Sequence, residues 1–390
     1  MTTLTHVSMV GSRIAVILYA VHLHASTALV GVFGALFAAV AIFSSVQVGR
    51  WLDHSGRRLP LLIGCGVQAL GTALGFVWPS LTGLFVLCII VGTFNNMFFI
   101  TQQNLIGEYG GPADRVSNFS LSGLAFSAAS FAGPLIAGFA IDSVGYRWTF
   151  LLLALVPLIP TAILAFDKLE FPPRRARPQA AEPSAAGAGP AARGSALALL
   201  RHSRLSPVFI AAVLSQATWN LFSILMPIYL AGRGLSASQI GVTVSCFYFA
   251  SMVSRLFLPA LARRFTPWQL LFASFAGGSL SFVGFTFTDN IAVIALLSVW
   301  LGMVLGFTGP MVLTLLYEAS PPGRTGEVVG VRVTLMNICS TAVPLLAGSI
   351  GAMVGVAPAF WVLGAALLAG GWSANKQAKL RARANSAAAT

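Results

Sequence analysis

Apolar runs of about twenty residues recur along the chain, separated by short polar clusters and Gly/Pro turns. An α-helix of this length crosses the hydrocarbon core of a bilayer. The runs are too long and too continuously apolar for barrel strands, so helices are the expected spanning form. The pattern predicts an all-α polytopic membrane protein with twelve transmembrane helices. Their predicted limits are 4–25, 28–50, 59–78, 81–107, 114–141, 147–166, 206–230, 237–261, 268–287, 291–317, 325–351 and 356–373.

A segment of different composition, residues 167–204, divides the spans into two sets of six. It is rich in Pro, Ala, Gly and Arg and offers little to bury, so we expect a mostly disordered linker with a short surface helix near 195–202. The predicted organisation is an N-terminal six-helix bundle (1–166), the linker, a C-terminal six-helix bundle (205–375) and a basic tail (376–390) that lies against the membrane surface.

Composition and charge support this class of protein. Hydrophobic residues make up 57% of the chain and charged residues 8%, whereas a soluble protein carries about 25% charged residues. With both termini in the cytoplasm, almost all loop cations lie there, and only Arg147 and Arg233 fall outside, as the positive-inside rule requires. The net charge of +13 is therefore a topology signal and a contact for anionic membrane lipids, and not a nucleic-acid surface. Loops rich in Ala and Arg indicate a bacterial inner (plasma) membrane.

The two halves are related by a gapless offset of 210 residues. The matches include Tyr, Glu and Pro, which are too rare here to align readily by chance. The matched pairs are Tyr19 and Tyr229, Gly31 and Gly241, Gly92 and Gly302, Glu108 and Glu318, Pro134 and Pro344, Gly138 and Gly348, Gly145 and Gly355, and Phe150 and Phe360. Two parallel six-helix repeats are the architecture of transporters that bind their solute at the repeat interface.

The polar stretch GRWLDHSGRR, residues 49–58, forms the predicted cytoplasmic turn between the second and third spans. Its glycines permit a tight turn, and an acid at the end of a span is costly without a partner. The defining positions are Gly49, Asp53, Gly56, Arg57 and Arg58. This spacing resembles the signature loop of the major facilitator superfamily (MFS), and the twelve spans, the repeat and the linker extend the resemblance over the whole chain.

The resemblance implies a secondary active transporter that moves a small organic solute by rocking its two halves, with the proton gradient as energy source. It also implies that Asp53 is a conformational latch, held by the N-terminal end of span 325–351 near Arg324 to Arg332, where the helix dipole favours an anion. A solvated turn that only sets topology is the alternative. The equivalent loop, residues 259–268, has Arg263 in place of the acid, so we expect a one-sided latch.

The fifth span contains Gly133-Pro134-Leu135-Ile136-Ala137-Gly138. This sequence resembles the Gly-Pro pattern of antiporters in the same family, with Ala137 where a second glycine is usual. The resemblance favours an exporter. Helix packing alone is the alternative, because Gly and Pro also permit kinks and close helix approach.

Two acids lie at the cytoplasmic ends of spans. Glu108 and Glu318 are repeat equivalents, and charges at such depth usually have partners. We expect Glu108 to pair with Arg115, and Glu318 with Arg324 or Arg332, as gating ion pairs.

The remaining charges within spans are candidate substrate contacts. Arg13 lies in the first span and Arg255 in the eighth. Arg13 could instead extend to the membrane interface. Arg255 has Ser45 as its repeat equivalent, so its charge is not part of the shared scaffold. Further candidate contacts, with interhelical hydrogen bonding as the alternative for each amide, are Asn95, Asn96, Gln102, Trp219 and Asn220.

The positive sign of these deep charges argues for an anionic, zwitterionic or neutral amphiphilic solute. Two alternatives stay open. A multidrug exporter of hydrophobic cations would need an ionised acid in its cavity, and a lipid-moving (flippase-like) protein would need a lateral opening beside Arg255.

An enzyme is not expected, because the sequence contains no nucleophile–base set, metal box or phosphate loop. His22 and His24 are two ligands without nearby acids, which is too few for a metal site, and we expect no cofactor. The expected partners are a small solute, membrane lipids and coupling protons, with the protein acting as a monomer.

Overall fold

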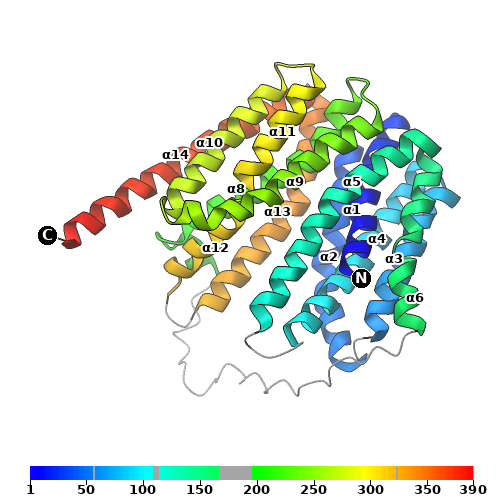
Figure 1. Cartoon of the computed structure of the whole chain (residues 1–390), viewed down its shortest axis with the longest axis horizontal. Helices are drawn as coiled ribbons and strands as arrows, with labels where there is room; N and C mark the ends of the chain where they lie inside the picture. The colour runs from blue at the N-terminus through cyan, green and yellow to red at the C-terminus, as the bar shows by residue number, and fades with distance from the viewer. Residues whose placement is uncertain (56–57, 109–113, 167–195, 322–323, 390) are drawn as a thin grey trace.

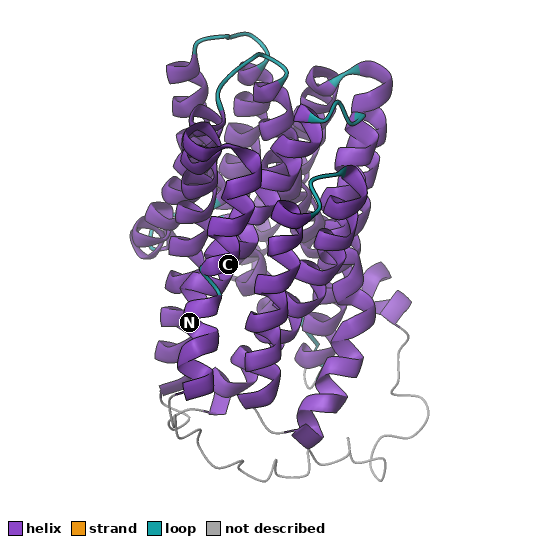
Figure 2. Ribbon diagram, turned by 90° about the vertical axis from the view of Figure 1, so that its right-hand side faces the viewer, coloured by secondary structure: helices purple, strands orange, loops and turns teal. Residues whose placement is uncertain are grey.

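The computed structural model describes residues 1–55, 58–108, 114–166, 196–321 and 324–389. Within them the chain consists of helices joined by short loops (Figure 2). The helices are α1 (Thr2–His22), α2 (Thr27–Ser55), α3 (Arg58–Val77), α4 (Leu81–Glu108), α5 (Asp114–Leu155), α6 (Leu158–Phe166), α7 (Ala196–Arg201), α8 (Ser206–Ala231), α9 (Ala237–Ala262), α10 (Pro267–Phe285), α11 (Ile291–Leu305), α12 (Thr308–Ala319), α13 (Thr325–Val354) and α14 (Val356–Ala389).

Helix α5 is longer than one membrane crossing. With α6 it forms an apolar stretch of 46 residues, Leu121–Phe166, which at 1.5 Å per residue measures ~69 Å, about twice the hydrocarbon thickness. The backbone leaves the helical region at Gly145 (φ 80°, ψ 169°) and divides the stretch into two crossings. Among the described residues, 10 stretches are long and apolar enough to span a membrane. Counting Leu121–Phe166 twice and adding α2 gives twelve crossings, so the predicted fold class is confirmed.

Two segments outside the crossings are helical. The short helix expected near 195–202 is α7. The helix of the last crossing does not end near residue 373: its apolar stretch is Val356–Lys379, and α14 continues as one helix to Ala389 and projects beyond the bundle (Figure 1). Residues 374–389 are mostly Ala, Lys, Arg and Gln, which are strong helix formers and propagate the helix after the apolar part ends.

The crossings form two six-helix bundles, α1–α6 and α8–α14 (Figure 1). The same pairs of crossings pack together in each: the first on the fifth (α1 on α5, α8 on α13) and the second on the fourth (α2 on α4, α9 on α11). The bundles meet along two seams, α2 against α13 and α5 against α9. Each seam pairs the second crossing of one half with the fifth crossing of the other half, as the 210-residue repeat requires.

In each seam the two helices approach backbone to backbone at a glycine. A Cβ added at Gly31 in α2 would lie 2.5 Å from the carbonyl oxygen of Pro344 in α13, and one added at Gly241 in α9 would lie 2.5 Å from that of Pro134 in α5. These contacts are repeat equivalents. The glycines that face them across the seams are Gly348 and Gly138. Neither seam has room for a side chain at these positions, so small residues set the distance between the halves.

The repeat extends to the turns that follow the seam helices. Gly145 and Gly355 both have left-handed backbone angles, with φ 80° and 86° and ψ 169° at each. Glycine takes this conformation without the steric cost that a Cβ would bring. Two ring contacts also repeat: Tyr19 with Phe150, and Tyr229 with Phe360.

The tightest contacts of both seams lie near one end of the molecule. We call the end that carries residues 166 and 196 the linker side and the opposite end the far side; Gly31 and Gly241 lie near the far-side starts of α2 and α9. The face of α13 that carries Pro344 continues towards the linker side through Asn337 and Thr334, and both are exposed. The same face is therefore sealed on the far side and open on the linker side.

We expect Gly31→Val to loosen the far-side seal, because the new side chain would meet the Pro344 carbonyl. Overpacking of this kind costs ~1–3 kcal/mol. A cysteine introduced at Ala357, which lines a far-side cavity, should react with a maleimide about tenfold faster in this variant, on a background without the native cysteines. Gly330→Ala in α13 is the matched control, because no atom lies within 4 Å of a Cβ added there. Unchanged labelling in a well-folded Gly31→Val protein would contradict the seal.

Candidate functional site

Two arginines and a tryptophan face one cavity of about 130 Å³ in the C-terminal half. Arg255 comes from α9, Arg332 from α13 and Trp219 from α8. The cavity lies where these helices meet α12, and its polar lining also includes Gln216 and Thr308. The described residues that line it include no Asp or Glu. The cavity is therefore positively charged. A position at a cavity was predicted for Arg255, whereas Arg332 was predicted to be a gating residue.

Neither arginine has a counter-ion in the part of the chain that the structure describes. Arg255 Nη1 donates to Ser127 Oγ in α5, 3.2 Å away, across the seam between the halves. Arg332 Nε is buried and has no hydrogen-bond partner among the described residues. Of the ion pairs formed within the described ranges, none involves Arg255 or Arg332. Two cations thus share a cavity in which donor capacity is left unused.

Aromatic rings continue the site towards the first helix. Trp219 packs edge-on against Phe247, with ring centroids 4.8 Å apart, and lies 5.8 Å from Tyr248. Tyr248 is in turn close enough to Arg13 of α1 for electrostatic interaction. Arg13 Nε is also buried without a hydrogen-bond partner. Arg13 is therefore within electrostatic range of a tyrosine of the opposite half that packs on Trp219.

The predicted amide contacts lie mainly in helix packing. Gln102 Nε2 donates to Ser122 Oγ in α5 at 3.4 Å, and Asn220 Nδ2 donates to Ser340 Oγ in α13 at 3.2 Å. Asn95 is buried and Asn96 half-buried in α4. These contacts fit the interhelical alternative, and a role in binding solute stays a prediction for all four amides.

Most of the predicted cytoplasmic gate lies outside the described side chains. These residues are Gly49, Asp53, Gly56, Arg57, Glu108 and Arg115. Arg58 is described: Nε donates to Leu164 O at 2.8 Å and Nη2 to Ala165 O at 3.1 Å. It therefore ties the start of α3 to the carbonyl end of α6, where cations stabilise a helix.

The second predicted gate pair involves a partner that the sequence analysis missed. Arg324 forms a bidentate ion pair with Glu327, with distances of 2.8 and 2.9 Å. This pair raises the pKa of the Arg324 guanidinium. Glu318 is exposed at the end of α12, and its proposed pairing with Arg324 stays a prediction. Arg332 lines the cavity, and its role in gating stays a prediction.

The Gly-Pro motif of α5 is a packing element on two sides. A Cβ at Gly133 would lie 3.0 Å from the backbone nitrogen of Gly11 in α1, whereas Pro134 and Gly138 face Gly241 across the seam. The motif thus joins its own bundle to the opposite one. This arrangement fits both the packing alternative and an antiporter role.

Asp142 is a contact between the halves that the sequence analysis did not identify. Its Oδ1 accepts from the backbone N–H of Ala237 at 3.1 Å, and its Oδ2 from that of Ser238 at 2.8 Å. A carboxylate from one half therefore caps the N-terminus of α9 in the other, where the helix dipole favours an anion. The repeat equivalent of Asp142 is Ala352, so only one seam has this contact.

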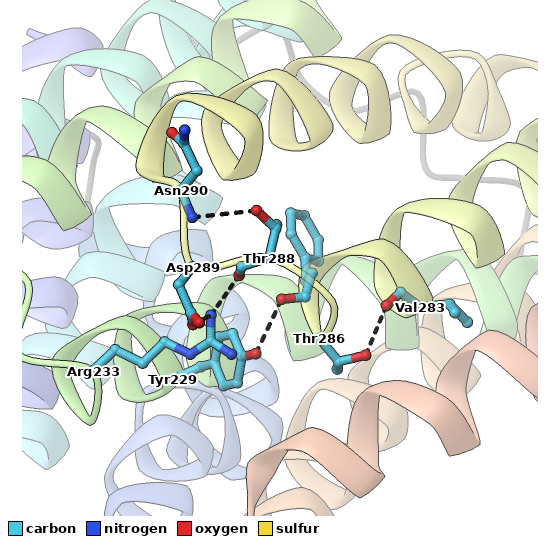
Figure 3. A network of polar contacts seen from close by, with 8 residues as sticks. Tyr229, Arg233, Val283, Thr286, Thr288, Asp289 and Asn290 are labelled. Carbon is cyan, nitrogen blue, oxygen red and sulfur yellow. Dashed lines mark hydrogen bonds and ion pairs between the residues drawn. The ribbon is translucent and has the colours of Figure 1, made fainter.

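A second far-side acid stays within one half. Asp289 pairs with Arg233 Nη1 at 2.7 Å, and Arg233 lies over the Tyr229 ring at 4.3 Å (Figure 3). The Tyr229 hydroxyl donates to Phe285 O at 3.0 Å. This network joins α8 to the loop after α10 and does not cross a seam, in contrast to Asp142.

Two repeated six-crossing bundles that meet at two glycine seams, beside a positively charged cavity, are the architecture of a membrane transporter. The sequence profile of the Major Facilitator Superfamily matches residues 1–344. The chain belongs to this superfamily, and its substrate is accordingly a small molecule.

Curated relatives are similar over most of the chain at low identity. The class D tetracycline resistance protein of Salmonella ordonez is 25% identical over 81% of this chain and 78% of its own. The multidrug resistance protein MdtG of Dickeya zeae is 24% identical over 84% and 80%. The enterobactin exporter EntS of Citrobacter koseri is 24% identical over 80% and 75%.

Solved structures share the fold. A bacterial homologue of the human lysosomal transporter Spinster, inward-facing and occupied, superposes with a TM-score of 0.73 at 12% identity, over 97% of this chain and 95% of that one. The nucleoside transporter NupG superposes with a TM-score of 0.75 at 14% identity, over 96% and 98%.

We expect Asp142→Ala to favour opening of the far side, because it removes the acceptors of the Ala237 and Ser238 N–H groups that join the two halves. Losing an N-terminal cap costs ~1 kcal/mol, roughly a fivefold change in an equilibrium. Spin labels at Ser80 and Phe287, on far-side loops of opposite halves, should show a larger population at long distance. Asp289→Ala removes an acid from the same side but not from a seam, and should leave the distances unchanged. Equal distance distributions in the two variants would contradict the role of Asp142.

Proposed function

We propose that the protein exports a small organic solute by alternating access, in which the two halves rock about the seams. The observation that carries this proposal is the pair of repeat-equivalent contacts on the far side, Gly31 with Pro344 and Gly241 with Pro134, beside an α13 face that is exposed towards the linker side. Loop cations on the linker side, such as Arg263 and Arg264, favour a cytoplasmic location for that side and for both termini. The described state would then face inward, in a bacterial inner membrane, with the chain acting as a monomer.

Export is supported by two observations. The Gly133-Pro134 motif lies at the seam between α5 and α9, and curated relatives are named as resistance proteins or as an exporter. We propose the proton gradient as the energy source, by analogy with the superfamily. Protons and bound lipids are therefore the expected partners besides the solute.

The solute is proposed to be anionic, zwitterionic or a neutral amphiphile. Arg13, Arg255 and Arg332 bring positive charge to the region between the halves, and none of them forms an ion pair within the described residues. A cationic solute would meet repulsion that is strong at low dielectric. The names of the tetracycline and multidrug relatives favour a second candidate, export of hydrophobic cations, for which the described cavity lining offers no acid.

Transport in everted membrane vesicles tests the proposal. Vesicles that contain the protein should accumulate members of an organic anion or zwitterion panel when respiration acidifies the lumen, and a protonophore should abolish the accumulation. Vesicles without the protein are the control. Accumulation of cations alone would favour the second candidate, and no accumulation of any class would contradict export.

We propose that Asp53 is the latch of the cytoplasmic side, and we expect Asp53→Asn to slow transport without weakening solute binding. The reason is that an amide loses the charge that a helix N-terminus stabilises, whereas the binding cavity is untouched. Vesicle transport rates and the dissociation constant of a transported solute measure the two effects separately. An equal loss of binding would show that Asp53 acts at the solute site and not as a latch.

A further inference from the structure

We infer that Arg255, Arg332 and Trp219 form a binding site for the carboxylate of a planar aromatic acid. This inference narrows the solute class of the proposed function and rests on it for its physiological meaning. Binding itself can be measured without transport. Arg332 thereby becomes a ligand-contacting residue in place of the gating role that its sequence position suggested.

The geometry leaves guanidinium donors available to a ligand. Two guanidinium groups line the same cavity of about 130 Å³. Arg332 Nε is buried without an acceptor, and leaving a buried charged donor unsatisfied is unfavourable. Among the described residues, Arg255 donates to one neutral acceptor, the Ser127 hydroxyl. A carboxylate would bring two acceptor oxygens in the planar arrangement that a guanidinium matches.

The fold does not require these charges. The repeat equivalents of Arg255 and Arg332, 210 residues earlier, are Ser45 and Ser122. Ser122 is buried and accepts a hydrogen bond from Gln102, so the N-terminal bundle packs with a small hydroxyl at the position that Arg332 occupies in the C-terminal bundle. Both arginines are additions to one half of a repeated scaffold. Because intramembrane cations are costly, a ligand is the physical reason for having two together.

The surrounding walls favour a planar, singly charged ligand. Trp219 lines the cavity and is held edge-on by Phe247, so its ring is a fixed surface for stacking. Leu305, Val312 and Met336 supply apolar lining. A carboxylate carries one charge into these surroundings, whereas a phosphate dianion would pay a larger desolvation penalty.

The same arginine that would hold the ligand also touches the other half. Arg255 Nη1 reaches Ser127 of α5 across the α5–α9 seam. A ligand carboxylate on Arg255 would therefore sit one residue away from the contact between the bundles. This placement gives bound ligand a direct effect on the seam about which the halves are proposed to rock.

Calorimetric titration of the purified full-length protein in detergent tests the site with three probes of one shape: 2-naphthoate, 2-naphthamide and 2-naphthylmethylammonium. We expect 2-naphthoate to bind at least tenfold more tightly than the other two, because only it forms charge-assisted bonds with both arginines. Arg255→Gln and Arg332→Gln should each weaken its binding about tenfold or more. Arg255→Lys and Arg332→Lys keep the charge, and should lose less.

Arg264→Gln is the matched control. It removes one exposed positive charge nine residues beyond Arg255, on the linker side, and should leave binding unchanged. Equal affinity for the three probes, or an equal loss in the control, would overturn the site. Dodecyl phosphate is a fourth probe, and its binding in preference to 2-naphthoate would replace the aromatic acid with a lipid-like anion. A thermal unfolding scan of each variant identifies misfolding. If a glutamine variant is misfolded, the binding of 2-naphthoate to the corresponding lysine variant tests the site in its place.

The vesicle assay separates failure of the site from failure of the proposed function. Export of some solute by a protein that does not bind 2-naphthoate would overturn the site and leave export intact. Tight, arginine-dependent binding of 2-naphthoate by a protein that moves no solute would support the site and overturn export.

Discussion

The architecture depends on the close approach of helix backbones at two glycines, one in each seam between the halves. A Cβ added at Gly31 would collide with a carbonyl of α13, and a Cβ added at Gly241 would collide with a carbonyl of α5. In a bilayer, lipid chains are as apolar as the helices, so close packing rather than hydrophobic burial holds helices together. These glycine contacts lie on the far side, whereas the face of α13 that carries Pro344 is exposed towards the linker side.

On this symmetric frame the chain places charges asymmetrically. Arg255, Arg332 and Asp142 have Ser45, Ser122 and Ala352 as their repeat equivalents. The symmetric positions are glycines, a proline pair and aromatic residues, which set helix distance and direction. The asymmetric ones are charged, and they either face the cavity or cross a seam. Symmetry thus accounts for the scaffold, and departure from it marks the residues that distinguish one half from the other.

Much of the fold could be predicted from the sequence, because apolar length, polar turns and the 210-residue repeat are local or periodic signals. The same signals matched Gly31 with Gly241, Pro134 with Pro344 and Gly138 with Gly348. The site was predictable only in part. Arg255 was found because a charge within a span is conspicuous, but the cavity it shares with Arg332 depends on which faces of α9 and α13 converge. Asp142 was missed because its partners are backbone N–H groups 95 and 96 residues away, which no side-chain pattern reveals.

The gapless repeat also indicates how two copies of a single half would associate. A six-helix chain with a glycine in its second helix and a proline in its fifth has both surfaces of one seam, but they point to different sides of the bundle. Two copies related by a twofold axis would each offer the second helix to the other's fifth, which closes both seams at once in an isologous dimer. The present protein has the geometry of such a dimer joined into one chain by residues 167–195. Because the two halves are joined in one chain, one half can carry arginines that the other lacks. A true homodimer would carry every charge twice.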